Sequence, residues 1–178
     1  NAETRYIPPV VIASSRLEKW AQKIAIIGSG PAGLSAAYYL ATKGYKPTVF
    51  EKSQKPGGML TYGIPSFKLE KNIIDAEIQV IRELGVEIRC GVEVGKDVTI
   101  QQLREQGFEA FYIAIGCQGG RRPGVANEEA LGTSIAVEFL HKALEDENQT
   151  MEGDVVVVGG GNVAVDCAKT AKRFGAAG

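Results

Sequence analysis

The chain has 178 residues, enough for one domain with a full core or for one domain and part of another. Its 20 basic and 21 acidic residues nearly cancel, so the charge predicts neither a nucleic-acid partner nor an anionic membrane partner. No apolar run reaches the roughly 20 residues of a membrane span, and the N-terminus lacks the apolar core of a signal peptide. The three cysteines form no C-x-x-C pair, which argues against a disulfide framework or a cysteine-bound metal and favours a cytoplasmic protein without a metal site.

The first third of the chain shows an alternation of strand and helix patterns. Residues 1–20 have no sustained period, so we expect an extended arm or linker there. The segment KIAIIG, residues 23–28, is continuously apolar after Lys23, as expected of a parallel strand covered on both faces. Residues 31–43 have apolar side chains at helical spacing, and residues 46–51 predict a second strand. Residues 52–68 are expected to form a glycine- and proline-rich loop.

The alternation continues through the remainder of the chain. Residues 69–116 predict an isoleucine-rich helix, the strand VEIRC, the stretch VEVGKDVT, a short helix near residues 100–106 and the strand AFYIAIG. Another helix is expected near residues 134–145, with Thr133 as its N-cap. Residues 154–178 predict a strand of four valines, a glycine-rich turn and a helix. This order indicates a doubly wound, Rossmann-like α/β fold.

The segment GSGPAG, residues 28–33, has the form of a dinucleotide-binding turn. Gly28 permits the tight turn, Gly30 lets a pyrophosphate approach the backbone, and Gly33 lets the helix pack against the strand. Pro31 fits the first helical position, where its missing N–H would have no partner. Glu51 ends the next strand, where a carboxylate can accept hydrogen bonds from ribose hydroxyls and would repel a 2′-phosphate. This turn is therefore expected to bind FAD or NAD rather than NADP.

The loop PGGMLTYGIP favours FAD over NAD at this turn. Its paired glycines, Gly57 and Gly58, follow Glu51 where the ribityl chain and ring of a flavin would need close backbone approach. The alternative is a surface loop built from turn-forming residues. Lys68 and Lys71 could attract an anion, although a solvated helix start is the commoner explanation. We expect His141 to be solvated rather than catalytic, and no catalytic side chain is predicted.

Several segments together resemble a known reductase module: residues 28–33, Glu51-Lys52, GGMLTYGIPSFKLEK, GVEVGKDVTIQQL and GGGNVAVDCAKTAKR. They are similar to the FAD/NAD(P)H-dependent module of the glutamate synthase small subunit. The module also occurs in dihydropyrimidine dehydrogenase and, more distantly, in adrenodoxin reductase. The resemblance implies that NADPH or NADH passes a hydride to FAD. Electrons then leave through iron–sulfur clusters in missing segments or in a partner, which would resemble the glutamate synthase large subunit or a ferredoxin.

The resemblance also implies where each cofactor lies. Ile115 stands where many relatives have threonine, which removes one expected hydroxyl contact. Alanine in place of the third glycine in the second turn often accompanies NADP, although the choice between NADH and NADPH stays open. The implied FAD-binding residues are Gly28, Gly30, Pro31, Ala32, Gly33, Glu51, Lys52, Gly58, Met59, Leu60, Gly63, Val94, Ala114, Ile115 and Gly116, and the implied NAD(P)H-binding residues are Gly159, Gly160, Gly161, Asn162, Val163 and Ala164.

We therefore expect an arm over residues 1–20, the first segment of an FAD-binding domain over 21–150, and the truncated start of an NAD(P)H-binding domain over 151–178. As a fragment, the chain is expected to have little or no turnover. The valine strand should pack on the FAD domain or pair with another copy of the chain. Three alternatives remain: a pyrimidine-reducing enzyme, a thioredoxin-reductase-like enzyme, and a non-catalytic FAD-binding domain.

Overall fold

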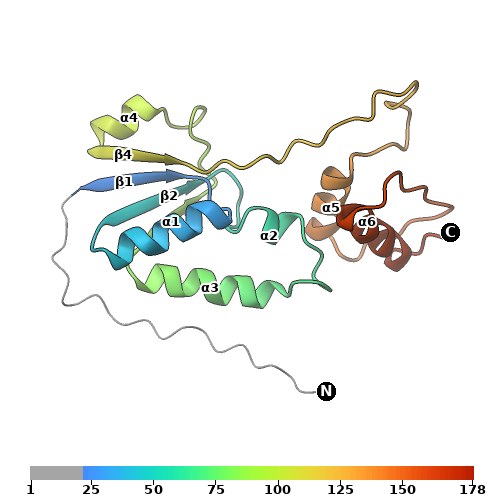
Figure 1. Cartoon of the computed structure of the whole chain (residues 1–178), viewed down its shortest axis with the longest axis horizontal. Coiled ribbons are helices and arrows are strands. Elements are labelled where there is room, and N and C mark those ends of the chain that lie inside the picture. Colours follow the sequence, from blue (N-terminus) through green and yellow to red (C-terminus); the bar gives the residue numbers. More distant parts are fainter. Residues whose placement is uncertain (1–21) are drawn as a thin grey trace, which may run out of the picture. The chain divides into compact units, whose positions relative to one another are not determined.

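The computed structural model describes residues 22–178, so the expected arm over residues 1–20 lies outside the described residues. The described chain forms two compact units, each held together by its own contacts (Figure 1). The first unit contains residues 22–61 and Glu70–Gly116, and the second contains Tyr62–Leu69 and Cys117–Gly178. A short stretch of the expected glycine- and proline-rich loop thus belongs to the second unit. The expected domain division after residue 150 stays a prediction.

The first unit is built on a parallel sheet of four strands in the order β3-β2-β1-β4. The strands are β1 (Lys23–Ile27), β2 (Lys46–Glu51), β3 (Glu87–Cys90) and β4 (Phe108–Ile113). β1 is central and, after its first residue, almost fully buried, which explains its continuously apolar sequence. β4 begins and ends earlier than the expected AFYIAIG strand, because the chain turns away from the sheet after Ala114.

Helices cover both faces of this sheet. α1 (Pro31–Thr42) and α3 (Lys71–Glu83) lie on one side, and α4 (Ile100–Glu105) lies on the other beside β4 (Figure 1). Under α4, the core cluster combines Ala25 and Phe50 from the sheet with Leu103 and Phe108. The short helix α2 (Met59–Tyr62) lies inside the segment expected to be a loop, so that expectation was wrong at these four residues. The doubly wound Rossmann-like fold is confirmed for this unit.

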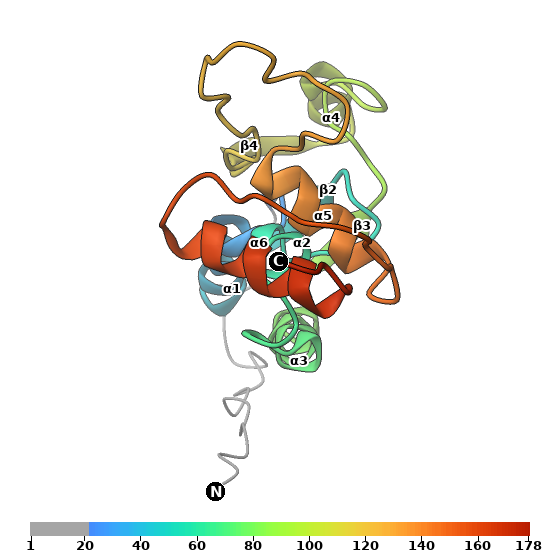
Figure 2. The same ribbon diagram turned by 90° about the vertical axis from the view of Figure 1, so that its right-hand side faces the viewer.

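Two helices form the body of the second unit. α5 (Ala136–Glu145) and α6 (Asn162–Arg173) lie side by side, and Figures 1 and 2 show this packing from two directions. The expectation that Thr133 caps α5 was wrong. The N-cap is Ile135, which provides no side-chain cap. The Thr133 hydroxyl instead donates hydrogen bonds to the carbonyls of Glu128 and Ala130, so it stabilises the turn before the helix.

The expected strand of valines does not form. A strand requires a neighbouring strand to pair its backbone, and the described part of the second unit contains none. The Val155 N–H donates instead to the Gly178 carbonyl, and the Ala177 N–H donates to the Gly153 carbonyl. Val156 and Val158 are 86% and 88% exposed. The helix that follows does form as expected.

Candidate functional site

The first glycine-rich turn connects β1 to α1 at the carboxyl end of the sheet. Gly28 has a φ of +103°, and its N–H donates to the Phe50 carbonyl at 2.8 Å. A side chain at Gly28 would collide with the carbonyl of Ala114, and one at Gly33 would collide with the Gly28 carbonyl. Glycine at both positions is therefore required by the packing of the turn itself, whatever the turn binds.

Gly30 is different, because nothing lies within 4 Å of the place where its side chain would be. It is the N-cap of α1, and no side chain caps this helix end. The backbone N–H groups of the first turn thus face an open position, where the helix dipole favours a negative charge. Pro31 occupies the first turn and, like Ala32, is exposed. This geometry fits a pyrophosphate that approaches the backbone at Gly30.

The loop after β2 reaches back to this turn. A side chain at Gly58 would lie 2.8 Å from the Gly30 Cα, and the φ of Gly58 is +55°. The Gly57 N–H donates to the Ser29 carbonyl at 3.0 Å. The paired glycines therefore lie directly against the first turn, as the FAD interpretation of the sequence requires. Met59 and Leu60 continue from them as half-buried residues at the start of α2.

Glu51 is buried at the end of β2, where two serines hold its carboxylate. Its Oε2 accepts hydrogen bonds from the Ser29 N–H at 2.9 Å and from the Ser29 hydroxyl at 2.6 Å. Its Oε1 accepts one from the Ser53 N–H at 2.8 Å. The side chain is thus fixed beside the glycine turn, at the place expected for a ribose-binding carboxylate. Sequence reasoning did not identify Ser29, because it occupies a variable position of the motif.

Hydrogen bonding sets the charge state of this carboxylate. Burial raises the pKa of Glu51, but the hydrogen bonds from Ser29 and Ser53 together lower it by more than burial raises it. The pKa of Glu51 therefore lies below the ordinary value of 4.5. Across the sheet, Cys90 pairs with Glu51 in register. Burial, and then the negative charge of Glu51, raise the pKa of the Cys90 thiol. Glu51 is therefore ionised at neutral pH while Cys90 stays protonated.

Strand order places these elements at the point where the order of the strands reverses. The chain runs from β1 outward to β3 and then returns to the other side of β1 as β4, so strand order reverses between β1 and β4. Ligands of open α/β sheets bind outside the carboxyl ends of the strands at such a point. Ala114 continues the pairing there, donating its N–H to the Ile27 carbonyl at 2.8 Å. Beyond it, Ile115 is 65% exposed and Gly116 has a φ of +68°.

The remaining residues expected to bind FAD lie in three different parts of the structure. Lys52 follows Glu51 and is exposed. Val94 forms a parallel bridge with Val98 and packs at the edge of the core cluster around Phe50. Gly63 is buried and belongs to the second unit.

The second glycine-rich turn leads into α6. Gly159 has a φ of +134°, and Gly161 is the N-cap of a helix end without a side-chain cap. Open space surrounds both Gly160 and Gly161, whereas Ala164 lies 3.6 Å from where a Gly159 side chain would begin. Asn162 and Val163 form the exposed first turn of the helix. The turn thus presents free helix N–H groups as the first one does. Unlike the first turn, it does not directly follow a strand in the described structure.

Residues Tyr62–Leu69 pack against α5 and α6, which the sequence did not predict. Phe67 lies under the Arg173 guanidinium, 3.8 Å from the ring centroid to Cζ. Lys68 was expected either to be solvated at a helix start or to attract an anion. In the structure it forms an ion pair with Asp166 on α6. Tyr62 meets the His141 ring edge to face, with centroids 4.9 Å apart. These contacts join positions far apart in the chain, so no local pattern could have shown them.

The described residues 22–177 match the family model for pyridine nucleotide-disulphide oxidoreductases. The chain belongs to this family. It is 51% identical over 158 residues to the beta subunit of an NADP(+)-dependent formate dehydrogenase from Moorella thermoacetica, covering 87% of this chain and 22% of that protein. It is 39% identical over 173 residues to the glutamate synthase [NADPH] small chain of Escherichia coli, covering 91% of this chain and 36% of that protein.

The likeness of this pyridine nucleotide-disulphide oxidoreductase to solved structures supports the same family assignment. FprA from Mycobacterium tuberculosis in complex with NADPH matches with a TM-score of 0.68 and 26% identity, over 83% of this chain and 36% of that chain. The chain thus spans little more than a third, or less, of the curated relatives it matches. The predicted resemblance is confirmed at the level of the family. FAD together with NADPH or NADH are the cofactors of this family.

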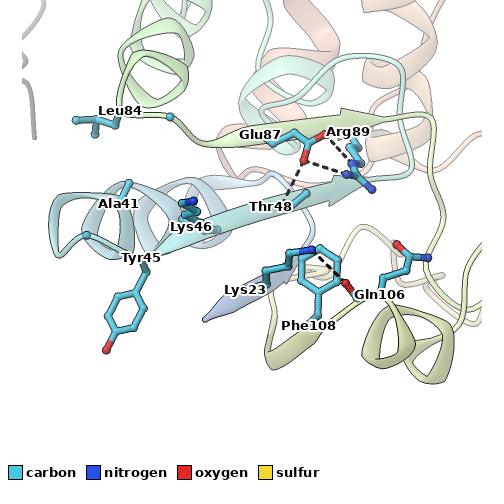
Figure 3. A pocket seen from close by; sticks show the side chains of 13 residues that line it. Lys23, Ala41, Tyr45, Lys46, Thr48, Leu84, Glu87, Arg89, Gln106 and Phe108 are labelled. Atoms are coloured by element: carbon cyan, nitrogen blue, oxygen red, sulfur yellow. Dashed lines mark hydrogen bonds and ion pairs between the residues drawn. The ribbon is translucent and has the colours of Figure 1, made fainter. Parts of the chain in front are cut away.

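In this oxidoreductase, the cavity drawn in Figure 3 lies at the opposite end of the sheet from the glycine turn. It has a volume of about 400 Å³ and is lined by the starts of all four strands. Three of its charged groups have partners. Glu87 pairs with Arg89 at 2.8 Å, and the Lys23 ammonium donates to the Gln106 carbonyl at 3.2 Å. The cavity is therefore separate from the candidate cofactor site.

Two further findings concern residues 22–178 alone. No helix in this range is long and apolar enough to cross a membrane. Within the same range, His, Cys, Asp and Glu side chains do not gather in groups of three or more that could hold a metal ion. The three cysteines, Cys90, Cys117 and Cys167, are free thiols.

Proposed function

We propose that this chain is the FAD-binding module of an NAD(P)H-dependent oxidoreductase, and that its first turn holds the FAD. The observation that carries the proposal is the close arrangement of Glu51, Gly30 and Gly58 at the carboxyl end of the sheet. An ionised carboxylate lies beside an uncapped helix end, and a buried glycine pair packs against the same turn at Gly30. A ribose, a pyrophosphate and a flavin chain need these three features in this order.

Each residue would act on a different part of FAD. The N–H groups after Gly30 would bind the pyrophosphate, and Glu51 would accept a hydrogen bond from the ribose. Gly58, Met59 and Leu60 would line the path of the ribityl chain, and Gly116 would allow the chain after β4 to pass close to the cofactor. When bound, FAD supplies hydride-accepting and single-electron chemistry, whereas the protein supplies binding and orientation. No side chain of the chain is needed as an acid or base.

The second turn is proposed to bind the pyrophosphate of NADPH or NADH through the N–H groups that follow Gly161. Its open glycines support this role. The valine segment before it forms no strand, so the turn is not held on a sheet as the first one is. We therefore propose that this chain alone turns over little NAD(P)H. We also propose that the exposed valines pair with a strand of another copy of the chain.

The parent enzyme is proposed to resemble the glutamate synthase small subunit and to pass electrons to a partner subunit or domain with iron–sulfur clusters. The motif YGIPSFKLEK supports this branch. A second candidate is an electron-transferring subunit like the formate dehydrogenase beta subunit, because the identity to that protein is higher over the matched residues. The terminal acceptor distinguishes the two candidates.

FAD titration followed by anaerobic addition of NADPH or NADH tests the proposal. In the complete protein that carries this segment, we expect stoichiometric FAD and bleaching of its absorbance by one of the two nucleotides. Absence of FAD would overturn the proposal, and bound FAD that neither nucleotide reduces would favour a non-catalytic flavin domain. Assays of glutamate formation, formate-dependent NADP+ reduction and uracil reduction then separate the branches.

A further inference from the structure

Ser29 lies at the junction of three parts of the candidate FAD site. Its side chain is fully buried, and its hydroxyl donates to Glu51 Oε2 at 2.6 Å. The same hydroxyl accepts a hydrogen bond from the Gly57 N–H at 3.2 Å. One small side chain therefore connects the glycine turn, the carboxylate at the end of β2 and the loop that lies against Gly30. None of these hydrogen bonds requires a bound cofactor.

The hydrogen bonds that hold this carboxylate come from two serines. Oε2 accepts the N–H and the hydroxyl of Ser29, which fill its two acceptor positions. Oε1 accepts the Ser53 N–H, and the Ser53 side chain also hydrogen-bonds to the carboxylate. Without the Ser29 hydroxyl, the carboxylate would lose its shortest bond and the side chain could rotate.

We propose that Ser29 is a positioning residue for the FAD ribose: it fixes the Glu51 carboxylate beside the glycine turn, and it connects this carboxylate to the Gly57-Gly58 loop. The inference rests on the proposed function of this turn. A hydroxyl is required at this position because it must donate to Glu51 and accept from Gly57 at the same time. Alanine or glycine in its place would keep the backbone bond from the Gly57 N–H to the residue 29 carbonyl, but it would lose both hydrogen bonds of the hydroxyl.

The connection has a consequence for the pH dependence of binding. The Ser29 hydroxyl is the largest of the influences that lower the pKa of Glu51, while burial raises it. Cys90 is the titratable group that faces Glu51 from β3, and its thiol stays neutral under acidic conditions because its pKa is raised. Lys52 is exposed, and the other neighbours that act on Glu51 are serine groups. Removing the hydroxyl should therefore move protonation of Glu51 to higher pH, and a protonated Glu51 binds the ribose less well.

The test compares Ser29→Ala with Ser35→Ala, the same change at an exposed position of α1. FAD dissociation constants are measured between pH 8 and pH 4.5 by flavin fluorescence. As the pH is lowered, the FAD affinity of Ser29→Ala should begin to fall at a higher pH than that of the unchanged protein. At the acidic end of the range, the variant should bind FAD more weakly than the unchanged protein, by roughly tenfold for each unit by which the substitution raises the Glu51 pKa. Ser35→Ala should follow the unchanged protein. In a Glu51→Gln background, the effect of Ser29→Ala on the pH profile should vanish.

A second readout does not depend on FAD. Carbon NMR of the Glu51 carboxyl in the cofactor-free protein should show a pKa below 4.5, and a higher value after Ser29→Ala. Equal pH profiles and equal pKa values in both proteins would overturn the positioning role while leaving FAD binding intact. Loss of FAD binding by the unchanged protein would instead overturn the proposed function. If Ser29→Ala does not fold, a Glu51 pKa at or above 4.5 in the unchanged protein overturns the inference.

Discussion

Lys68 and Asp166 form an ion pair although they lie 98 positions apart, with Lys68 Nζ at 2.8 Å from Asp166 Oδ1. The hydrogen bond runs to Oδ2 at 2.9 Å, and the contact at Oδ1 is electrostatic because that atom receives no hydrogen bond of good geometry. The Asp166 side chain is 9% exposed, whereas the Lys68 side chain is 43% exposed. The pair therefore attaches the segment Tyr62–Leu69 to α6 and neutralises a buried charge.

Replacing Lys68 by methionine should destabilise the protein, because Asp166 would keep a buried charge without its cation. We expect a loss of about 1–3 kcal/mol in the free energy of unfolding, since one partner stays partly in water. Urea unfolding followed by circular dichroism measures the loss. Lys169→Met, at an exposed position of the same helix, is the matched control. Equal losses for the two variants would show that the ion pair does not stabilise this unit.

Gly33→Ala and Gly30→Ala should separate folding from binding. A methyl group at Gly33 collides with the Gly28 carbonyl, so we expect a loss of roughly 1–3 kcal/mol in stability. Gly30 has open space and a φ of −67°, so alanine there should leave stability within about 0.5 kcal/mol. FAD titration should nevertheless show weaker binding by Gly30→Ala, because its methyl occupies the pyrophosphate approach. Unchanged FAD affinity in that variant would contradict the proposed approach.

The stability contributed by Glu51 should depend on pH. Its pKa in the folded protein is lowered, so its contribution is complete above the unfolded pKa, about 4.5, and is lost as pH falls through the folded pKa. The difference in unfolding free energy between the unchanged protein and Glu51→Gln should be constant from pH 8 to about pH 5.5 and shrink on further acidification. Urea unfolding across this range measures it. A difference that grows on acidification would contradict the hydrogen-bond assignment.

Thr99 and Thr133 provide a comparison between an observed cap and an expected one. Thr99 caps α4 and forms a reciprocal capping box with Gln102. Thr99→Ala should therefore cost about 1 kcal/mol of stability. Thr133→Ala removes a hydroxyl that bonds exposed carbonyls before α5, and the expected loss is below about 0.5 kcal/mol. Thermal unfolding of both variants shows which substitution costs more stability. A larger loss for Thr133→Ala than for Thr99→Ala would contradict the prediction.

The proposed pairing of the valine segment predicts concentration-dependent association. Val156→Lys combined with Val158→Lys should abolish it, because charged side chains on an exposed edge prevent strand pairing. Val125→Lys changes another exposed valine of the same unit and serves as the control. Sedimentation velocity at several concentrations reports the species. A monomer at all concentrations for the unchanged chain would exclude this self-association.

The local elements of this protein follow closely from its sequence. Strand β1 is apolar after Lys23 because both of its faces are covered, and Gly28 and Gly33 occupy positions where a side chain would meet backbone. Both effects act within a few residues or between adjacent elements, so sequence patterns record them. The spacing of the dinucleotide-binding motif also placed Glu51 beside the turn, and the structure agrees with that position.

Tertiary structure decided the features that depend on partners distant in sequence. The four valines before Gly159 have the composition of a strand, but a strand exists only where another pairs with it, and the second unit contains none among the described residues. The positioning role of Ser29 could be inferred only from the structure, in which its hydroxyl bonds to both Glu51 and Gly57. The sequence by itself determined which segments could be strands, turns and helices. Only folding decided which polar groups are buried together, because hydrogen bonds and ion pairs depend on distance in space rather than on separation along the chain.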